Sequence, residues 1–109
     1  MLRGQQGVVE MNLPIPWTIN ISPAAGGTAK FHPPQITIAV TDQVHWANGD
    51  PANAHWPGLL FNGQLNKQFF MQNQIAPNSP STTWTPSGTG TYTYECSLHP
   101  HERGTIVVS

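Results

Sequence analysis

The chain has 109 residues, of which only 8% are charged, and its formal net charge is −1. This length fits one domain, residues 1–109, and the lack of a basic surface argues against nucleic acid as a partner. No apolar run is long enough for a signal peptide or a membrane span, so we expect neither within this sequence.

Eleven prolines and ten glycines interrupt the chain, and short apolar–polar alternations take the place of any sustained helical stripe. These features predict an all-β domain of short strands joined by turns, arranged as an antiparallel sandwich or barrel. The predicted strands cover residues 8–11, 17–21, 35–41, 44–47, 67–72, 81–84, 90–96 and 105–109.

Cys96 is the only cysteine, so it cannot form a disulfide within the chain. Alternation along residues 90–96 places Tyr92, Tyr94 and Cys96 on one face, which aims the thiol into the core at the end of a strand. His99 follows three residues later, and a thiolate and an imidazole on one short loop form half of a site for a soft metal. The alternative is a buried, inert thiol.

Five histidines are available to complete such a site. Alternation turns His45 away from the core, and His32 precedes two prolines at the start of a strand, so we assign structural roles to both. His55 lies on the loop after residues 44–47 and is not bound by strand alternation. In a sandwich this loop and the Cys96–His99 loop can lie at the same end, which gives the two-histidine, one-cysteine set that suits copper.

Four motifs occur in the order typical of one protein family. They are Phe31-His-Pro-Pro-Gln-Ile-Thr-Ile, Asp42-Gln-Val-His-Trp-Ala-Asn-Gly-Asp, Gly90-Thr-Tyr-Thr-Tyr-Glu-Cys-Ser-Leu-His-Pro and Arg103-Gly-Thr-Ile-Val-Val. Over residues 31–109 the chain resembles the cupredoxins, and within them the plastocyanin, amicyanin and pseudoazurin subgroup. The resemblance implies an antiparallel Greek-key β-sandwich that binds one copper ion through His55, Cys96 and His99.

The chain departs from this subgroup at the axial position. Where the amicyanin-like motif has a methionine, three residues after the second histidine, this chain has Glu102. A carboxylate is harder than a thioether and favours Cu(II), so Glu102 as a fourth ligand would lower the reduction potential and shift the colour from blue toward green or red. The alternative is that Glu102 turns outward and pairs with Arg103 or solvent. We expect His101 at the surface beside the site, with a role as an additional ligand as its alternative.

A second departure concerns the residue after His55. Relatives carry an asparagine there that ties the two ligand loops together, whereas this chain has Trp56. Asn48 and Asn53 are candidates to orient His55 in its place. The apolar stretch from Trp56 to Phe61 is expected to cap the core, and an apolar rim around an exposed histidine edge is its alternative.

The resemblance implies an electron carrier rather than an enzyme. Copper would alternate between Cu(II) and Cu(I) while the protein, a monomer in the periplasm or another extracytoplasmic compartment, docks transiently with redox partner proteins. Copper storage, delivery or sensing is one alternative, and a small redox enzyme with an open copper position is another. The same donors would fit tetrahedral zinc, which is therefore a second candidate metal.

Overall fold

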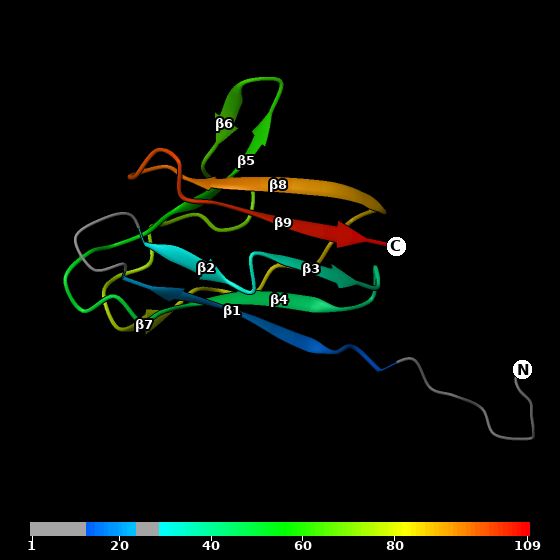
Figure 1. Ribbon diagram of the computed structural model, residues 1–109. Coiled ribbons are helices and arrows are strands. Elements are labelled where there is room, and N and C mark those ends of the chain that lie inside the picture. Colours follow the sequence, from blue (N-terminus) through cyan, green and yellow to red (C-terminus); the bar gives the residue numbers. More distant parts are fainter. Residues whose placement is uncertain (1–12, 24–28) are drawn as a thin grey trace, which may run out of the picture.

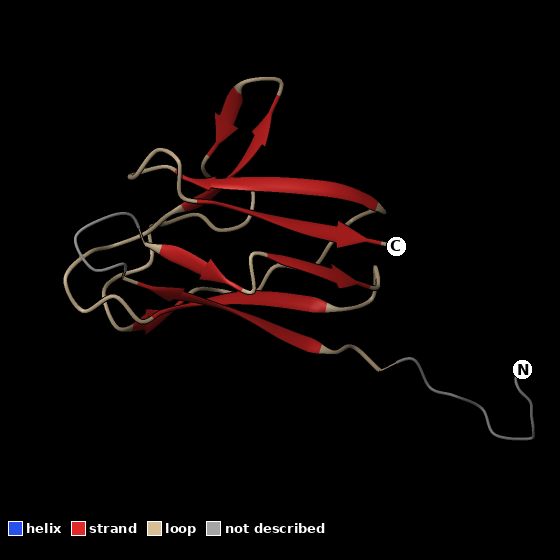
Figure 2. Ribbon diagram, in the orientation of Figure 1, coloured by secondary structure: helices blue, strands red, loops and turns tan. Residues whose placement is uncertain are grey.

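The computed structural model describes residues 13–23 and 29–109, which form two β-sheets packed face to face (Figure 1). One sheet has the strand order β2–β1–β4–β7, and the other has the order β3–β9–β8–β5–β6. Loops join the strands, and the described ranges contain no helix and hence none that could cross a membrane (Figure 2). The strands are β1 (Pro16–Ser22), β2 (Lys30–His32), β3 (Gln35–Ile38), β4 (Gln43–Asn48), β5 (Pro57–Phe61), β6 (Gln64–Asn66), β7 (Ser79–Pro80), β8 (Gly90–Cys96) and β9 (Arg103–Val108).

Aromatic side chains fill the space between the sheets. Trp46 on β4 and Tyr94 on β8 are fully buried, and their rings meet edge to face with centroids 5.4 Å apart. Phe31 packs edge to face on Tyr94 at 4.8 Å, and Phe70 lies 5.2 Å from Trp46. Such contacts add specific geometry to the burial of large apolar surfaces. The strands that carry Trp46 and Tyr94 are therefore held at a fixed separation, and β8 ends at Cys96.

The predicted β-sandwich is confirmed. The pairs β1–β4 and β3–β9 are parallel, and the other described strand pairs are antiparallel. The prediction for residues 90–96 coincides with β8, and those for 17–21, 35–41, 44–47 and 105–109 overlap β1, β3, β4 and β9. The prediction for residues 8–11 falls outside the described residues.

Two predicted strands are wrong. Residues 67–72 form turns and a loop from which Phe70 and Met71 enter the core, so apolar residues here reflect a buried crossover rather than a strand. The strands of this region are instead β5 and β6, joined by Asn62 and Gly63, whose φ angles of 51° and 74° suit a two-residue hairpin turn. Residues 81–84 contribute only an isolated bridge between Trp84 and Val44.

Asp42 fastens three segments at one end of the sandwich. Its carboxylate accepts hydrogen bonds from the backbone N–H groups of Ile15 (3.0 Å) and Ala39 (2.9 Å) and from the indole N–H of Trp17 (3.1 Å). The backbone hydrogen bonds from Ala39 and Ile15 lower the pKa of this carboxyl below its ordinary value. Asp42 therefore holds the start of β1, the end of β3 and the start of β4 together in its ionised form.

We expect Asp42→Asn to lower the midpoint of thermal unfolding by several degrees at pH 7, because the amide replaces a charged acceptor. The ionised carboxylate stabilises the fold above its unfolded pKa near 3.8, and this contribution is lost as the pH falls through the lower folded value. The difference between the two proteins should therefore shrink in acid. Thermal unfolding followed by circular dichroism from pH 2 to 7 measures it, and a pH-independent difference would contradict this role.

Candidate metal centre

Two loops at the other end of the sandwich bring the candidate ligands together. Cys96 ends β8 and is 1% exposed, so its side chain points inward as alternation predicts. His99 and Glu102 lie on the loop from β8 to β9, which is closed by a hydrogen bond from the N–H of Cys96 to the carbonyl of Glu102 (2.8 Å). His55 comes from the loop before β5, where two backbone hydrogen bonds pair it with Ile75.

Four donor atoms converge at this end. One ligand atom each of His55, Cys96, His99 and Glu102 lies within 4.8 Å of all the others. The Cys96 sulfur is 3.7 Å from Nδ1 of His55 and 3.5 Å from Nδ1 of His99. Tetrahedral bonding at the lengths typical of zinc places nitrogen and sulfur donors roughly 3.6 Å apart. Their separations and chemical types therefore fit a single bound metal ion.

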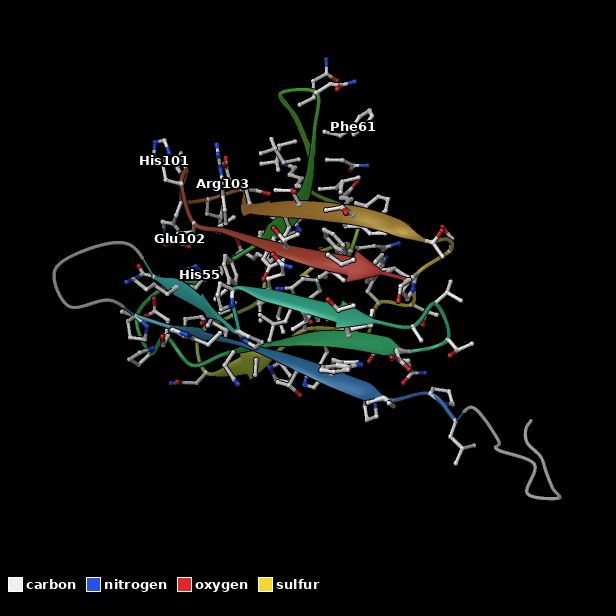
Figure 3. The ribbon with its side chains drawn as sticks, turned by 45° about the vertical axis from the view of Figure 1, so that its right-hand side comes forward. His55, Phe61, His101, Glu102 and Arg103 are labelled. Carbon is white, nitrogen blue, oxygen red and sulfur yellow. The ribbon has the colours of Figure 1, made fainter. Side chains whose placement is uncertain are left out.

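Glu102 points into this cluster. It is 4% exposed, and its Oε1 lies 2.9 Å from Nδ1 of His55 and 3.6 Å from Nδ1 of His99. The other oxygen, Oε2, accepts a hydrogen bond from the backbone N–H of Ala29 (3.0 Å). Figure 3 shows Glu102 on the inner side of its loop, near His55. The alternative of an outward ion pair with Arg103 does not occur, because Arg103 pairs with Glu95.

The remote nitrogen of His55 also meets a carboxylate. Oδ2 of Asp50 lies 3.0 Å from Nε2 of His55, and both side chains are almost fully buried. Oδ1 of Asp50 accepts from the N–H groups of Ala52 and Asn53, which fixes the carboxylate in its loop. Metal-binding histidines commonly donate their second nitrogen to a carboxylate in this way, and such a partner fixes the ring orientation.

Charges inside the cluster determine the protonation of the metal-free site. Burial alone would lower the pKa of His55, but hydrogen bonds with Cys96 and Asp50 and the negative charge of Glu102 together raise it to about 9. The hydrogen bond with His55 lowers the pKa of Asp50 to about 2. In the metal-free protein near pH 7, His55 is therefore an imidazolium between two carboxylates, and a metal at Nδ1 takes the place of one proton.

The two ligand loops are tied through the backbone of Trp56. Its N–H points at the Cys96 sulfur (3.3 Å), and its carbonyl accepts from the N–H of Ser97 (2.7 Å). These contacts join the loops without the asparagine side chain expected from the family pattern. The apolar stretch from Trp56 to Phe61 is only partly buried. Trp56 and Leu59 pack against the core, as predicted, whereas Phe61 is 68% exposed on the β5–β6 hairpin.

Of the two histidines on the β8–β9 loop, the structure brings only His99 into the cluster. His101 is exposed with a φ of 78°, and its side chain points out of the sandwich (Figure 3). Neither Asn48 nor Asn53 forms a hydrogen bond with the His55 ring. The amide of Asn48 instead donates to the carbonyls of Asn53, Ile75 and Ala76, while Asn53 donates to Asp50.

Sequence reasoning missed Asp50. The signal available was its place in the Asn48-Gly-Asp-Pro turn, five residues before His55. An aspartate in such a turn can accept hydrogen bonds from backbone N–H groups two and three residues on. That pattern alone does not show that the second carboxylate oxygen faces an imidazole.

Proteins of known structure share this fold. No protein-family model matches the chain. Amicyanin from Paracoccus denitrificans is 34% identical over 82 residues, which cover 72% of this chain and 58% of that protein. A solved Cu(I) amicyanin variant with methionine replaced by glutamine is 26% identical, with a TM-score of 0.67 over 86% of this chain and 82% of that chain.

The chain belongs to the cupredoxins. Amicyanin from Paracoccus versutus shows the same fold at 20% identity, with a TM-score of 0.67 over 93% of this chain and 85% of that one. The cupredoxin described here spans about 58% of the length of the curated amicyanin that it matches. Its donor cluster has the cupredoxin arrangement of two histidines and a cysteine, with Glu102 where the family pattern has methionine.

We expect Asp50→Asn to weaken zinc binding by roughly 10- to 100-fold, because the amide is a poorer acceptor for Nε2–H of His55. Zinc is the probe because it is redox-silent, and competition with a chromophoric chelator measures its affinity. Asn53→Ala, which removes a neighbouring hydrogen bond to Asp50 but leaves both carboxylate oxygens, is the control and should have the smaller effect. Equal losses in both variants would contradict a specific role for Asp50.

The same variant should change the titration of His55 in the metal-free protein. Its folded pKa of about 9 lies above the ordinary 6.5, so the imidazolium stabilises the fold fully below pH 6.5, and this contribution is lost as the pH rises through 9. Removal of the Asp50 charge should lower the folded pKa of His55, so the alkaline loss of stability, which begins near the unchanged unfolded value of 6.5, should be smaller and complete at a lower pH. NMR titration of the His55 ring checks this, and an unchanged midpoint would exclude the interaction.

Proposed function

We propose that this cupredoxin binds one copper ion through His55, Cys96 and His99, with Glu102 as the fourth ligand, and carries single electrons between partner proteins in the periplasm. The observation that supports this most is the convergence of two Nδ1 atoms, one sulfur and one carboxylate oxygen within 4.8 Å. When bound, copper would supply one-electron chemistry between Cu(II) and Cu(I). Thiolate with two imidazoles is the donor set typical of electron-transfer copper sites.

The protein's own contribution is to hold the donors still. His55 is fixed through Asp50, Glu102 through Ala29, and Cys96 through the backbone of Trp56. Donors that the protein already holds in place move little when the copper ion changes its oxidation state. Fast electron exchange requires such small movements of the ligands. Donors held in this way therefore favour an electron carrier over an enzyme.

Glu102 is expected to determine how strongly the site prefers Cu(II) over Cu(I). An anionic oxygen donor stabilises Cu(II) relative to Cu(I), so the reduction potential should be lower than with a thioether. This bias also supports a second candidate, copper storage or delivery without electron exchange, if the site holds Cu(II) too strongly to cycle. The rate of electron self-exchange separates the two, since only a carrier needs rapid exchange.

The copper-loaded protein should show an intense sulfur-to-copper charge-transfer band in its visible spectrum. We expect Cys96→Ser to abolish this band, and His101→Ala to leave it unchanged, because His101 lies outside the cluster. Absorption and EPR spectra of the three proteins measure this. A wild-type protein without the band would overturn the proposed ligation by Cys96.

Replacement of Glu102 tests the fourth ligand. We expect Glu102→Met to raise the reduction potential by roughly 60 to 120 mV, the equivalent of a ten- to hundred-fold change in the Cu(II)/Cu(I) preference of a one-electron couple. Glu102→Gln, which keeps the shape and an oxygen acceptor for Ala29 but removes the charge, should shift the potential in the same direction by less. Cyclic voltammetry gives the potentials, with circular dichroism as the check on folding. An unchanged spectrum and potential in both variants would exclude ligation by Glu102.

A further inference from the structure

In the described ranges, most carboxylates are buried and all lysine and arginine side chains are exposed. Four carboxylates are described, and only Glu95 reaches the surface, where it pairs with Arg103. The other three are at most 4% exposed and are Asp42, Asp50 and Glu102. The described cations, in contrast, are all exposed, namely Lys30, Lys67 and Arg103. A chain with a formal net charge of −1 therefore presents a positive surface over its described part.

Two of these cations lie on either side of Glu102. Lys30 directly follows Ala29, whose N–H binds Glu102, and Arg103 directly follows Glu102 itself. A groove of about 450 Å³ lies between β2 and the start of β9 at this point. Its polar lining includes Lys30, His32, His101 and Arg103. The Arg103 side chain points out of the sandwich on the same side as His101 (Figure 3).

The third cation lies beside the other ligand loop. Nζ of Lys67 is 5.0 Å from the ring centre of Trp56, the residue that follows His55. The backbone of Lys67 also passes close to Gly58, which pairs with Glu95 on β8. Neither Lys67 nor Lys30 forms an ion pair with another residue of the described ranges. Lys30 and Arg103 thus line the groove beside Glu102, and Lys67 lies beside the residue that follows His55, so all three cations lie near residues of the two ligand loops.

The opposite end has no exposed charged side chain among the described residues. Its one carboxylate, Asp42, is buried and satisfied by its three hydrogen bonds. At the metal end the carboxylates of Asp50 and Glu102 face His55 inside the cluster, so a partner meets Lys30, Lys67 and Arg103 first. Charges placed on one face orient an incoming protein and raise its association rate.

We propose that Lys30, Lys67 and Arg103 form a cationic rim around His99 that docks an acidic face of a redox partner protein. His99 is the most exposed of the four candidate ligands, with a side chain 36% exposed, and is the ligand edge that a docked partner would approach. The inference rests on the proposed electron transfer, for which a partner must approach a ligand edge. Charge complementarity selects the partner: an acidic surface gains favourable contacts with Lys30 and Lys67, which are unpaired within the described ranges, whereas a second copy brings like charges together.

The first test maps anion binding on the full chain without relying on copper chemistry. Hexacyanochromate(III), a paramagnetic and redox-inert trianion, is titrated into the ¹⁵N-labelled protein, metal-free and in the Cu(I) form. We expect line broadening of backbone amides near Lys30, Lys67 and Arg103 and none near Thr41 and Thr91 at the far end. Broadening spread evenly over the surface, or confined to the far end, would overturn the proposal.

The second test uses two double variants with the same change in net charge. Lys30→Gln with Lys67→Gln removes two positive charges at the rim, and Thr41→Glu with Thr91→Glu adds two negative charges at the far end. The rim variant should bind a 20-residue poly-L-glutamate roughly tenfold more weakly at low salt, and the far-end variant less than twofold more weakly. Equal losses would show that net charge alone acts and would overturn the rim.

Other occupants give distinct results. Binding to phosphatidylglycerol vesicles without binding to poly-L-glutamate would assign the rim to a membrane, and self-association at low salt would assign it to a second copy; either overturns the proposal. Localised broadening in a protein that lacks the copper band would support the cationic docking face while overturning the proposed electron transfer. A normal copper band with no localised broadening would support ligation of copper by Cys96 and overturn the cationic docking face.

Discussion

The imidazole of His55 is clamped between two buried carboxylates, and the metal end of the molecule depends on this arrangement. Nε2 meets Asp50 and Nδ1 meets Glu102, while Glu102 in turn accepts from Ala29 at the start of β2. One ring thereby connects its own loop, the β8–β9 loop and the neighbouring sheet. Burial of two carboxylates is unfavourable unless each is paired and hydrogen-bonded, and here the pairing comes from His55 and backbone N–H groups.

The sandwich makes this clamp possible through strand register. β8 pairs with β5 and β9 so that Pro57 faces Cys96 and Glu95 faces Arg103. The register sets where both ligand loops begin, and the contacts of Trp56 with Cys96 and Ser97 hold them at that separation. Backbone pairing therefore positions both ligand loops, and their four donor atoms lie within 4.8 Å of one another.

Local patterns in the sequence were enough for some parts of this architecture and not for others. Alternation in residues 90–96 predicted the inward Cys96, and spacing with the family pattern selected His55 and His99 for the donor set. The β5–β6 hairpin was missed because Pro57–Phe61, which precedes the Asn62-Gly63 turn, lacks apolar–polar alternation. Residues 67–72 were mistaken for a strand because a buried loop can be equally apolar. The inward direction of Glu102 depends on Ala29, 73 positions away in the chain, and no local pattern carries that contact.

The hydrogen bond between Glu102 and Ala29 links the choice of residue at position 102 to the backbone directly before β2. A thioether at this position is a very weak acceptor, so it would leave the Ala29 N–H buried without an adequate partner, a loss of about 1–3 kcal/mol of folding free energy. A change toward the common methionine would thus require a compensating change elsewhere. Positions 102 and 29 are therefore expected to show epistasis, and should be exchanged together when sites are grafted between cupredoxins.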